Sequence, residues 1–173
     1  MLNGEKITLR PMEESDMPEY QKLINSDSIS SRVVGWGFPV SFAEQCKWFA
    51  NAVSDQRNRR FTIVSSKEPS VIYGMISLTA IDWHNRTATI GLKLNESSQK
   101  RGIGTEALQL MMKYAIEQVN LRRLEASWLA DNEGSERLYL KCGWQKEGVR
   151  KAAIYRNGKY VDLIEAAYIP KGE

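Results

Sequence analysis

The stretch QKRGIGT, residues 99–105, is the most informative part of the sequence. Gly102 and Gly104 stand in a segment that follows a predicted strand and opens a predicted helix. Glycine lets the backbone turn tightly and approach a ligand closely, and a helix start adds unpaired N–H groups and a positive dipole end. Lys100 and Arg101 add positive charge. The stretch can form a pyrophosphate cradle, although a loop that needs glycines only to turn would look the same.

Regular segments flank this stretch on both sides. Residues 87–94 are rich in strand formers, and residues 124–129 form another predicted strand. Between them, residues 104–119 carry a core stripe at helical spacing, made of Leu108, Met111, Met112, Ala115 and Val119. A strand, a helix and a second strand in this order predict a parallel crossover. Neither the Walker pattern GxxxxGK[ST] nor the dinucleotide pattern GxGxxG is present.

The remainder of the chain predicts several strands and three more helices. Helices are predicted to start at the cap residue Asp16, at the capping box Ser41–Glu44 and near Glu133, the last of them ending at Gly143. Strands are predicted over residues 7–10, 61–65, 71–79, 144–150, 153–156 and 160–169, with a hairpin turn at Asn157-Gly158. We therefore expect a single domain over residues 1–173, of the α/β (α+β) class. Its central sheet is mixed but mostly antiparallel, with helices on both faces.

Composition narrows the class of protein. The chain has 173 residues, of which 42% are hydrophobic and 26% charged, as in ordinary globular proteins. A net charge of +3 without a coherent basic stripe does not favour a nucleic-acid partner. No apolar stretch is long enough to span a membrane and no signal peptide is present, so a cytoplasmic protein is expected. Cys46 and Cys142 form no CxxC pair, so neither a metal site nor a disulfide is expected.

A second set of polar residues, Asn132, Ser135 and Tyr139, follows the strand at 124–129. Asn132 and Ser135 can cap a helix, and Tyr139 lies one turn beyond Ser135 on the same face. A tyrosine at this place can belong to the core. It can also act as a general acid toward a departing thiolate, because phenol and thiol pKa values are about 10 and about 8.5. The residues alone leave both interpretations open.

Together these motifs resemble the GNAT superfamily of acetyltransferases. QKRGIG resembles its Q/R-x-x-G-x-G/A signature, and N-x-x-S-x-x-x-Y-x-K-x-G-[FW] follows at the expected distance. The segments SDQRNRRF and NGKYVDLIEAAYI are similar to the subgroup of ribosomal-protein N-terminal acetyltransferases and spermidine N-acetyltransferases. The resemblance implies transfer of acetyl from acetyl-CoA to a primary amine by direct attack, without a metal. Homodimers are common in this subgroup, so a homodimer is expected.

The resemblance also implies roles for individual residues. The backbone of residues 92–94 would pair with the pantetheine arm of acetyl-CoA, and residues 99–105 would hold the pyrophosphate. Residues 132–139 would contact the lower CoA arm, and Tyr139 would protonate the leaving thiolate. The cofactor-binding residues expected in this way are Leu92, Lys93, Leu94, Gln99, Lys100, Arg101, Gly102, Ile103, Gly104, Thr105, Asn132 and Ser135.

One departure from the family pattern concerns the general base. Thr89 stands where many relatives carry a glutamate, and a threonine hydroxyl is a poor base. Water, Asp82 or His84 are then the alternative proton acceptors. His84 is the only histidine, and its ordinary pKa near 6.5 would suit a base. It lies in a predicted hairpin tip, however, where a solvent-exposed turn residue is the simpler interpretation.

A second departure concerns the acceptor. Spermidine acetyltransferases of this subgroup carry an acidic run where this chain reads GWGFPVS, residues 35–41, without a carboxylate. A polycation needs carboxylates to bind, so we expect a protein or peptide N-terminus first, an amino sugar or other small amine second and a polyamine last. The residues expected beside the amine are Trp36, Phe38, Asp82 and His84, although the aromatic ones can equally be packing residues. A non-catalytic CoA-binding module is the alternative from another class.

Overall fold

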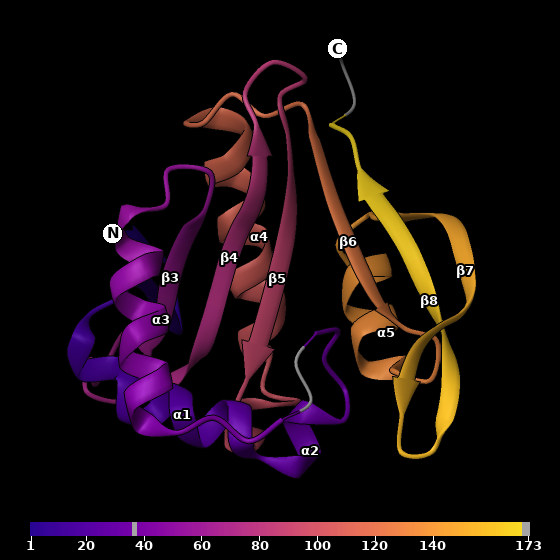
Figure 1. Cartoon of the computed structure of the whole chain (residues 1–173). Helices are drawn as coiled ribbons and strands as arrows, with labels where there is room; N and C mark the ends of the chain where they lie inside the picture. The colour runs from indigo at the N-terminus through magenta and orange to yellow at the C-terminus, as the bar shows by residue number, and fades with distance from the viewer. Residues whose placement is uncertain (36–37, 171–173) are drawn as a thin grey trace.

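The computed structural model describes residues 1–35 and 38–170. Eight strands form one sheet in the order β1-β2-β3-β4-β5-β6-β8-β7 (Figure 1). Only the β5–β6 pair is parallel, which confirms the expected mixed, mostly antiparallel sheet. The strands are β1 (Leu2–Asn3), β2 (Ile7–Pro11), β3 (Arg59–Ser65), β4 (Ile72–Asp82), β5 (Thr87–Leu94), β6 (Arg123–Leu129), β7 (Gln145–Arg156) and β8 (Lys159–Tyr168).

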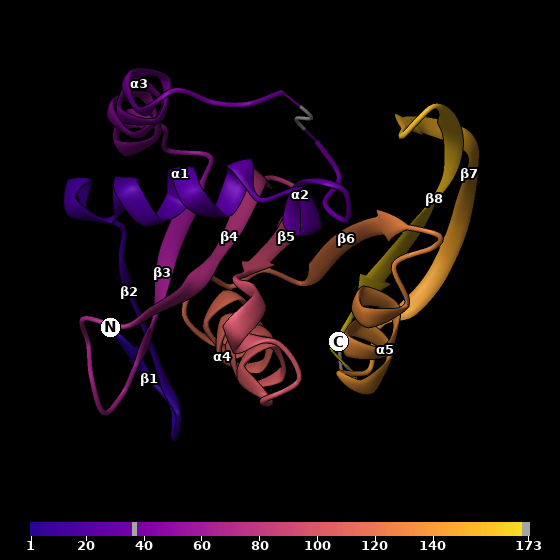
Figure 2. The ribbon, with the colours of Figure 1, turned by 90° about the horizontal axis from the view of Figure 1, so that it is seen from below.

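Helices cover both faces of the sheet, as expected. Figure 2 shows α1 and α3 on one side and α4 and α5 on the other. The helices are α1 (Met17–Asn25), α2 (Asp27–Ser30), α3 (Phe42–Ser54), α4 (Ile103–Glu117) and α5 (Glu133–Lys141). Among the described residues, no helix combines the length and the apolar character that crossing a membrane requires.

The main core lies between the sheet and α4. Leu108 and Met111 of the predicted helical stripe are fully buried there. They pack with alternate residues of the strands, which include Ile7, Ile63, Ile76, Ile90, Leu124 and Trp128. Alternate residues of a strand point to opposite faces, so the intervening residues of β4, β5 and β6 face the side of α1 and α3. This alternation assigns a face of the sheet to each residue of these three strands.

Several local predictions hold because short-range chemistry decides them. The Ser41 hydroxyl accepts a hydrogen bond from the backbone N–H of Glu44, whose carboxylate accepts one from the backbone N–H of Ser41, so the capping box is confirmed. Asn157 and Gly158 have positive φ angles of 47° and 80° and connect β7 to β8, as a two-residue hairpin turn requires. Gly143, with φ of 85°, follows the end of α5.

Two predicted details differ in the structure. Helix α1 begins directly after Asp16, as predicted, but the Asp16 side chain does not cap it. Asp16 is buried and pairs with Arg10 at 2.7 Å while accepting a hydrogen bond from Thr62 at 2.7 Å, so it fastens the start of α1 to β2 and β3. The two strands predicted over 144–156 are one strand, β7, whose pairing with β8 shifts register between Arg150 and Ile154. A bulge of this kind leaves little trace in an alternating pattern.

Candidate active site

Strands β5 and β6 separate after a short parallel contact. They pair only from Thr87 with Arg123 to Thr89 with Glu125. Beyond Thr89, β5 stays paired with β4 and β6 with β8, and the two strands diverge (Figure 1). Within the described part of the chain, residues 90–94 have no strand partner on the β6 side. Their backbone groups on that side can pair with an extended ligand in the manner of an added strand.

A set of unpaired backbone N–H groups lies at the wide end of this gap. Among described residues, no group accepts a hydrogen bond from the amides of residues 100–105. The first helical bond of α4 runs from the N–H of Glu106 to the carbonyl of Gly102. Gly102 has φ of 83°, a left-handed conformation that favours glycine. Unpaired amides at a helix N-terminus attract anions, so the loop has the chemistry of a pyrophosphate cradle.

Gly104 explains how the start of α4 comes so close to β5 and α5. A Cβ atom at this position would lie 3.1 Å from Leu94 Cδ1, 3.5 Å from Leu138 Cδ2 and 3.6 Å from Leu92 Cδ2. Leu92 and Leu94 belong to β5, and Leu138 to α5. The lack of a side chain at Gly104 therefore lets α4, β5 and α5 pack closely together, and these elements carry the sequence motifs.

Basic side chains add charge to the loop. Lys100 and Arg101 are exposed, and the Arg101 guanidinium lies 5.6 Å from the centre of the Tyr73 ring. Lys6, which the sequence did not suggest, donates from Nζ to the carbonyl of Arg101 at 3.4 Å. It comes from the turn before β2, nearly a hundred residues away, so no local pattern could have indicated it. The loop is thus a positively charged region with its amides available.

Tyr139 of α5 is buried, with only 5% of its surface exposed. Its ring stacks on Trp128 at 5.1 Å with an interplanar angle of 5°, and meets the Trp144 ring edge-on at 5.0 Å. Burial raises the pKa of the phenol well above its ordinary value, so the hydroxyl is protonated at neutral pH. No described residue forms a hydrogen bond with this hydroxyl. The ring thus belongs to the core, while the hydroxyl is an available proton donor.

Asn132 has a structural role that occupies both ends of its amide. Its Oδ1 accepts from the N–H of Ser135 at 3.1 Å and so caps α5, while its Nδ2 donates to the carbonyl of Arg32 at 2.9 Å. The predicted capping is confirmed. The contact with the CoA arm that the resemblance implies for Asn132 and Ser135 stays a prediction.

Glu125 is a candidate site residue that the sequence did not suggest. The parallel register places it directly beside Thr89, where a carboxylate was expected and is absent. Leu124 and Ala126 are buried in the main core, so Glu125 faces the side of α1 and α3. Its carboxylate accepts a hydrogen bond from Arg123 Nε at 2.8 Å. The predicted crossover indicated that β5 and β6 are neighbours, but periodicity alone does not fix the register between two strands.

Asp82 and His84 lie at the connection between β4 and β5. The Asp82 carboxylate accepts from the backbone N–H groups of His84 and Asn85, both at 2.9 Å, and closes the β4–β5 turn. Asp82 is also the register partner of Thr87, two residues before Thr89. His84 is an exposed turn residue, and the place of both residues beside the amine stays a prediction.

Residues 32–35, which precede the two aromatic residues predicted beside the amine, are hydrogen-bonded to Asn132 at the start of α5 and to Arg156 of β7. Trp36 lies outside the described residues, and Phe38 is 69% exposed. Arg156 Nη2 donates to the carbonyls of Val33 at 3.0 Å and Gly35 at 2.8 Å. Figure 1 shows the residues that directly follow α2 beside the wide end of the gap between β5 and β6. The place of Phe38 beside the amine stays a prediction.

Neither cysteine forms a disulfide. Cys46 lies on α3 and Cys142 directly follows α5, and both are free thiols. Among the described residues, no group of three or more His, Cys, Asp and Glu side chains is arranged to hold a metal ion.

Comparisons with known proteins agree with this geometry. The GNAT acetyltransferase domain matches residues 6–145. Ribosomal-protein-serine acetyltransferase of Escherichia coli K12 is 30% identical over 163 residues, which cover 92% of this chain and 90% of that protein. Spermidine N(1)-acetyltransferase of the same strain is 26% identical over 164 residues, 95% of this chain and 86% of that protein.

A solved structure shares the fold over nearly the whole chain. Spermidine N-acetyltransferase from Vibrio cholerae, in complex with CoA and spermine, superimposes with a TM-score of 0.90 at 22% identity, covering 96% of each chain. The relatives include enzymes for two different acceptors, so they do not identify the amine. The chain belongs to the GNAT acetyltransferase family and is an acetyl-CoA-dependent N-acetyltransferase.

Proposed function

We propose that the protein acetylates a primary amine by direct attack on acetyl-CoA held between β5 and β6. The observation that carries this proposal is the strand gap that opens after Thr89 and ends at the unpaired amides of residues 100–105. An extended pantetheine arm would pair with the free edge of residues 90–94, and the pyrophosphate would lie on the loop. The thioester carbon would then lie near the narrow end of the gap.

Tyr139 would supply the proton that the departing CoA thiolate needs. Attack by the neutral amine forms the C–N bond, breaks the C–S bond and leaves a thiolate that takes the phenolic proton. Burial raises the pKa of Tyr139, which keeps the proton in place before the reaction. The proton that the amine releases restores the phenol. Because the amine attacks acetyl-CoA directly, no acyl-enzyme is required and neither cysteine takes part.

Glu125 would help the proton leave the amine, directly or through water. It lies beside Thr89 at the point where the strands separate, and faces the side opposite α4. Its carboxylate accepts a hydrogen bond from Arg123 Nε at 2.8 Å, which holds it at this place.

Thr89 in place of the usual strand glutamate favours an α-amino group over a polyamine. An α-amino group has a pKa near 8, whereas an alkyl amine such as that of lysine has a pKa near 10.4. At pH 7.5 a substantial fraction of the α-amino group is ready to attack without strong base catalysis. Residues 35–41 also lack the carboxylates that a trication would need. The acceptor order proposed is therefore a protein or peptide N-terminus, then an amino sugar or other small amine, then spermidine.

An acceptor panel tests this order. Peptides with free N-termini, amino sugars and spermidine would be compared by kcat/KM from thiol release, with the acetylated product checked by mass spectrometry. The kcat/KM comparison is the appropriate one, because a weakly held substrate can still react once it saturates the enzyme. Peptide N-termini are expected to give the highest value. Spermidine as the best acceptor would contradict the order but not the transfer reaction. A homodimer also stays a prediction; the Vibrio cholerae relative has a dodecameric structure.

A further inference from the structure

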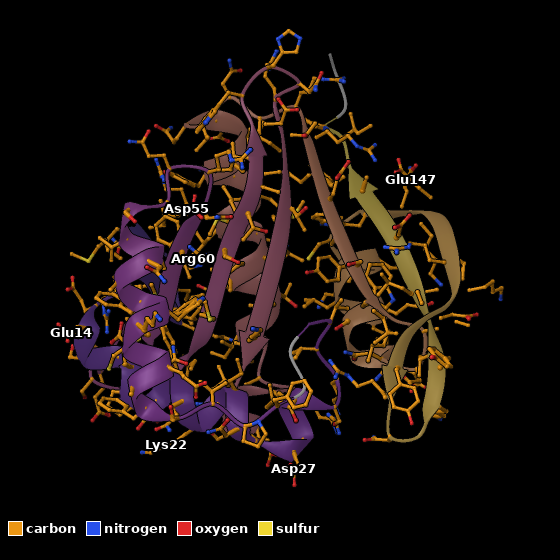
Figure 3. All side chains as sticks on the ribbon, viewed as in Figure 1. Glu14, Lys22, Asp27, Asp55, Arg60 and Glu147 are labelled. Carbon is orange, nitrogen blue, oxygen red and sulfur yellow. The ribbon has the colours of Figure 1, made fainter. Side chains whose placement is uncertain are left out.

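The face of the sheet opposite α4 carries two cations without counter-ions. Ile90, Leu92 and Leu94 of β5 pack with the core on the α4 side, so Lys93 between them points to the side of α1 and α3. Arg60 of β3 lies on the same side, because its register partner Ser77 is in turn the partner of Gly91 on β5. Figure 3 shows Arg60 on this side of the sheet, beside α3. We call Arg60 and Lys93 the cation pair.

The amine acceptor has to use this same face. The N-terminus of α4, which would hold the pyrophosphate, lies on the opposite side of the sheet (Figure 2). A nucleophile that attacks the thioester carbon in the gap therefore approaches from the side of α1 and α3. Gly91 is exposed there, and Thr89 and Lys93 of the same strand are partly exposed. The cation pair thus borders the surface over which the acceptor would lie.

No described residue neutralises the cation pair. Lys93 makes no ion pair or hydrogen bond through its side chain, and Arg60 Nη1 is buried without a hydrogen-bond partner. Burial lowers the pKa of both side chains. Repulsion by the charge of Arg60 lowers the pKa of Lys93 further. The ring of Trp48, 5.3 Å from the Arg60 guanidinium, is one favourable contact of this charge.

Three carboxylates on this side of the sheet already have partners. Asp16 pairs with Arg10. Asp55 attracts Arg60 without an ion pair and accepts hydrogen bonds from Asn58 and from the backbone of Arg57. Glu125 is held by Arg123. Each of these three carboxylates has a local partner, and none of them forms an ion pair or hydrogen bond with Arg60 or Lys93.

Two desolvated cations without an anion cost free energy, and such sites persist where a ligand brings the opposite charge. We infer that the cation pair binds an anionic group, a carboxylate or a phosphate, that the amine acceptor carries near its amine. This inference rests on the proposed transfer reaction and specifies its substrate class. It gives a second reason why a polycation is a poor acceptor, since Arg60 and Lys93 repel it. An acidic residue near the N-terminus of a peptide, or the phosphate of an amino-sugar phosphate, has this chemistry.

Binding to the CoA-loaded protein provides a test that does not depend on turnover. Calorimetry would compare a Ser-Glu peptide with the matched Ser-Gln peptide, and glucosamine 6-phosphate with glucosamine. We expect the anionic member of at least one pair to bind about tenfold more tightly, as charge-assisted hydrogen bonds allow. The pair that shows the preference identifies the source of the anion.

Variants then locate the preference. Lys93→Met and Arg60→Gln should each reduce the ratio between the anionic and neutral ligand to about threefold or less. The matched control Lys113→Met removes an exposed lysine on α4 and should keep the ratio of the unmodified protein. Because the readout is a ratio, a change in overall stability or CoA affinity does not imitate the effect, and Lys93→Gln serves if Lys93→Met fails to fold.

Two outcomes would overturn the inference. Equal affinity for the anionic and neutral members of both pairs would remove the subsite, as would a preference that survives both Lys93→Met and Arg60→Gln. Failure of the proposed reaction looks different. In that case no amine on the panel would release thiol from acetyl-CoA, whatever the binding ratios are.

Discussion

The Tyr139→Phe variant separates the two interpretations of this residue because it removes one hydroxyl and keeps the ring. The phenylalanine ring can still stack on Trp128 and meet Trp144 edge-on, as the Tyr139 ring does at 5.1 Å and 5.0 Å. No described residue forms a hydrogen bond with the hydroxyl. The free energy of unfolding should therefore change by less than about 1 kcal/mol, and the affinity for CoA should be largely retained.

The chemical step should respond much more strongly. Loss of a general acid lowers kcat by about 10²–10⁴-fold, which corresponds to about 3–5 kcal/mol in the activation barrier. The assay is kcat from thiol release under saturating acetyl-CoA, with calorimetry of CoA binding and denaturant unfolding on the same preparation. The matched control is Tyr114→Phe on α4, whose ring packs edge-on against Phe61 at 5.6 Å and which should keep near-normal kcat.

A Tyr139→Phe enzyme that folds normally and turns over at the unmodified rate would remove Tyr139 from the mechanism. A loss of stability with normal turnover would leave it only its role in the core. The raised pKa of Tyr139 adds a pH criterion. Ionisation of this phenol should cause no loss of rate up to about pH 10, the ordinary tyrosine pKa, because the buried group is still protonated there.

Three further predictions concern the cradle, the base and the buried ion pair. Gly104→Val places a branched side chain where even a Cβ atom would lie only 3.1 Å from Leu94 Cδ1. Calorimetry should show weaker CoA binding, and unchanged affinity would rule out this cradle. Glu125→Gln should lower kcat/KM more at pH 7 than at pH 9, where an α-amino group with pKa near 8 has already lost its proton; an equal loss at both values would argue against proton removal. Asp16→Asn should lower the free energy of unfolding by about 3 kcal/mol, because it breaks the ion pair with Arg10 in which Asp16 is buried. An unchanged denaturation midpoint would contradict a stabilising role of this pair. Burial opposes the Asp16 charge, but hydrogen bonds from Arg10, Glu13 and Thr62 lower its pKa, so its stabilisation is complete above the unfolded value of about 3.9 and is lost as the pH falls through the folded value.

The features that the sequence predicted well depend on local chemistry. The glycine turn at Gly102 before α4, the core stripe of α4 and the Asn157-Gly158 turn each follow from residues a few positions apart. Tyr139 was singled out from its place one turn beyond Ser135, although its aromatic neighbours Trp128 and Trp144 could be named only from the structure.

The features that the sequence did not predict depend on the pairing of distant segments. The contact of Glu125 with Thr89 needs the register of a parallel pair, which a slip of one residue would change. Asp16 has a helix-cap sequence, but its pairing with Arg10 prevails over the cap. A buried ion pair of this kind becomes visible only when the strands are in place.

Hydrogen exchange of individual amides tests the central claim, that acetyl-CoA lies between β5 and β6 with its pyrophosphate on the cradle. In the free protein the amides of residues 100–105 have no partner among the described residues and should exchange rapidly. Saturating CoA should slow their exchange, together with that of amides on the β6-facing edge of residues 90–94. The turn at Asp82–Asn85 should not respond. Unchanged exchange at 90–94 and 100–105, with protection appearing elsewhere, would contradict the account.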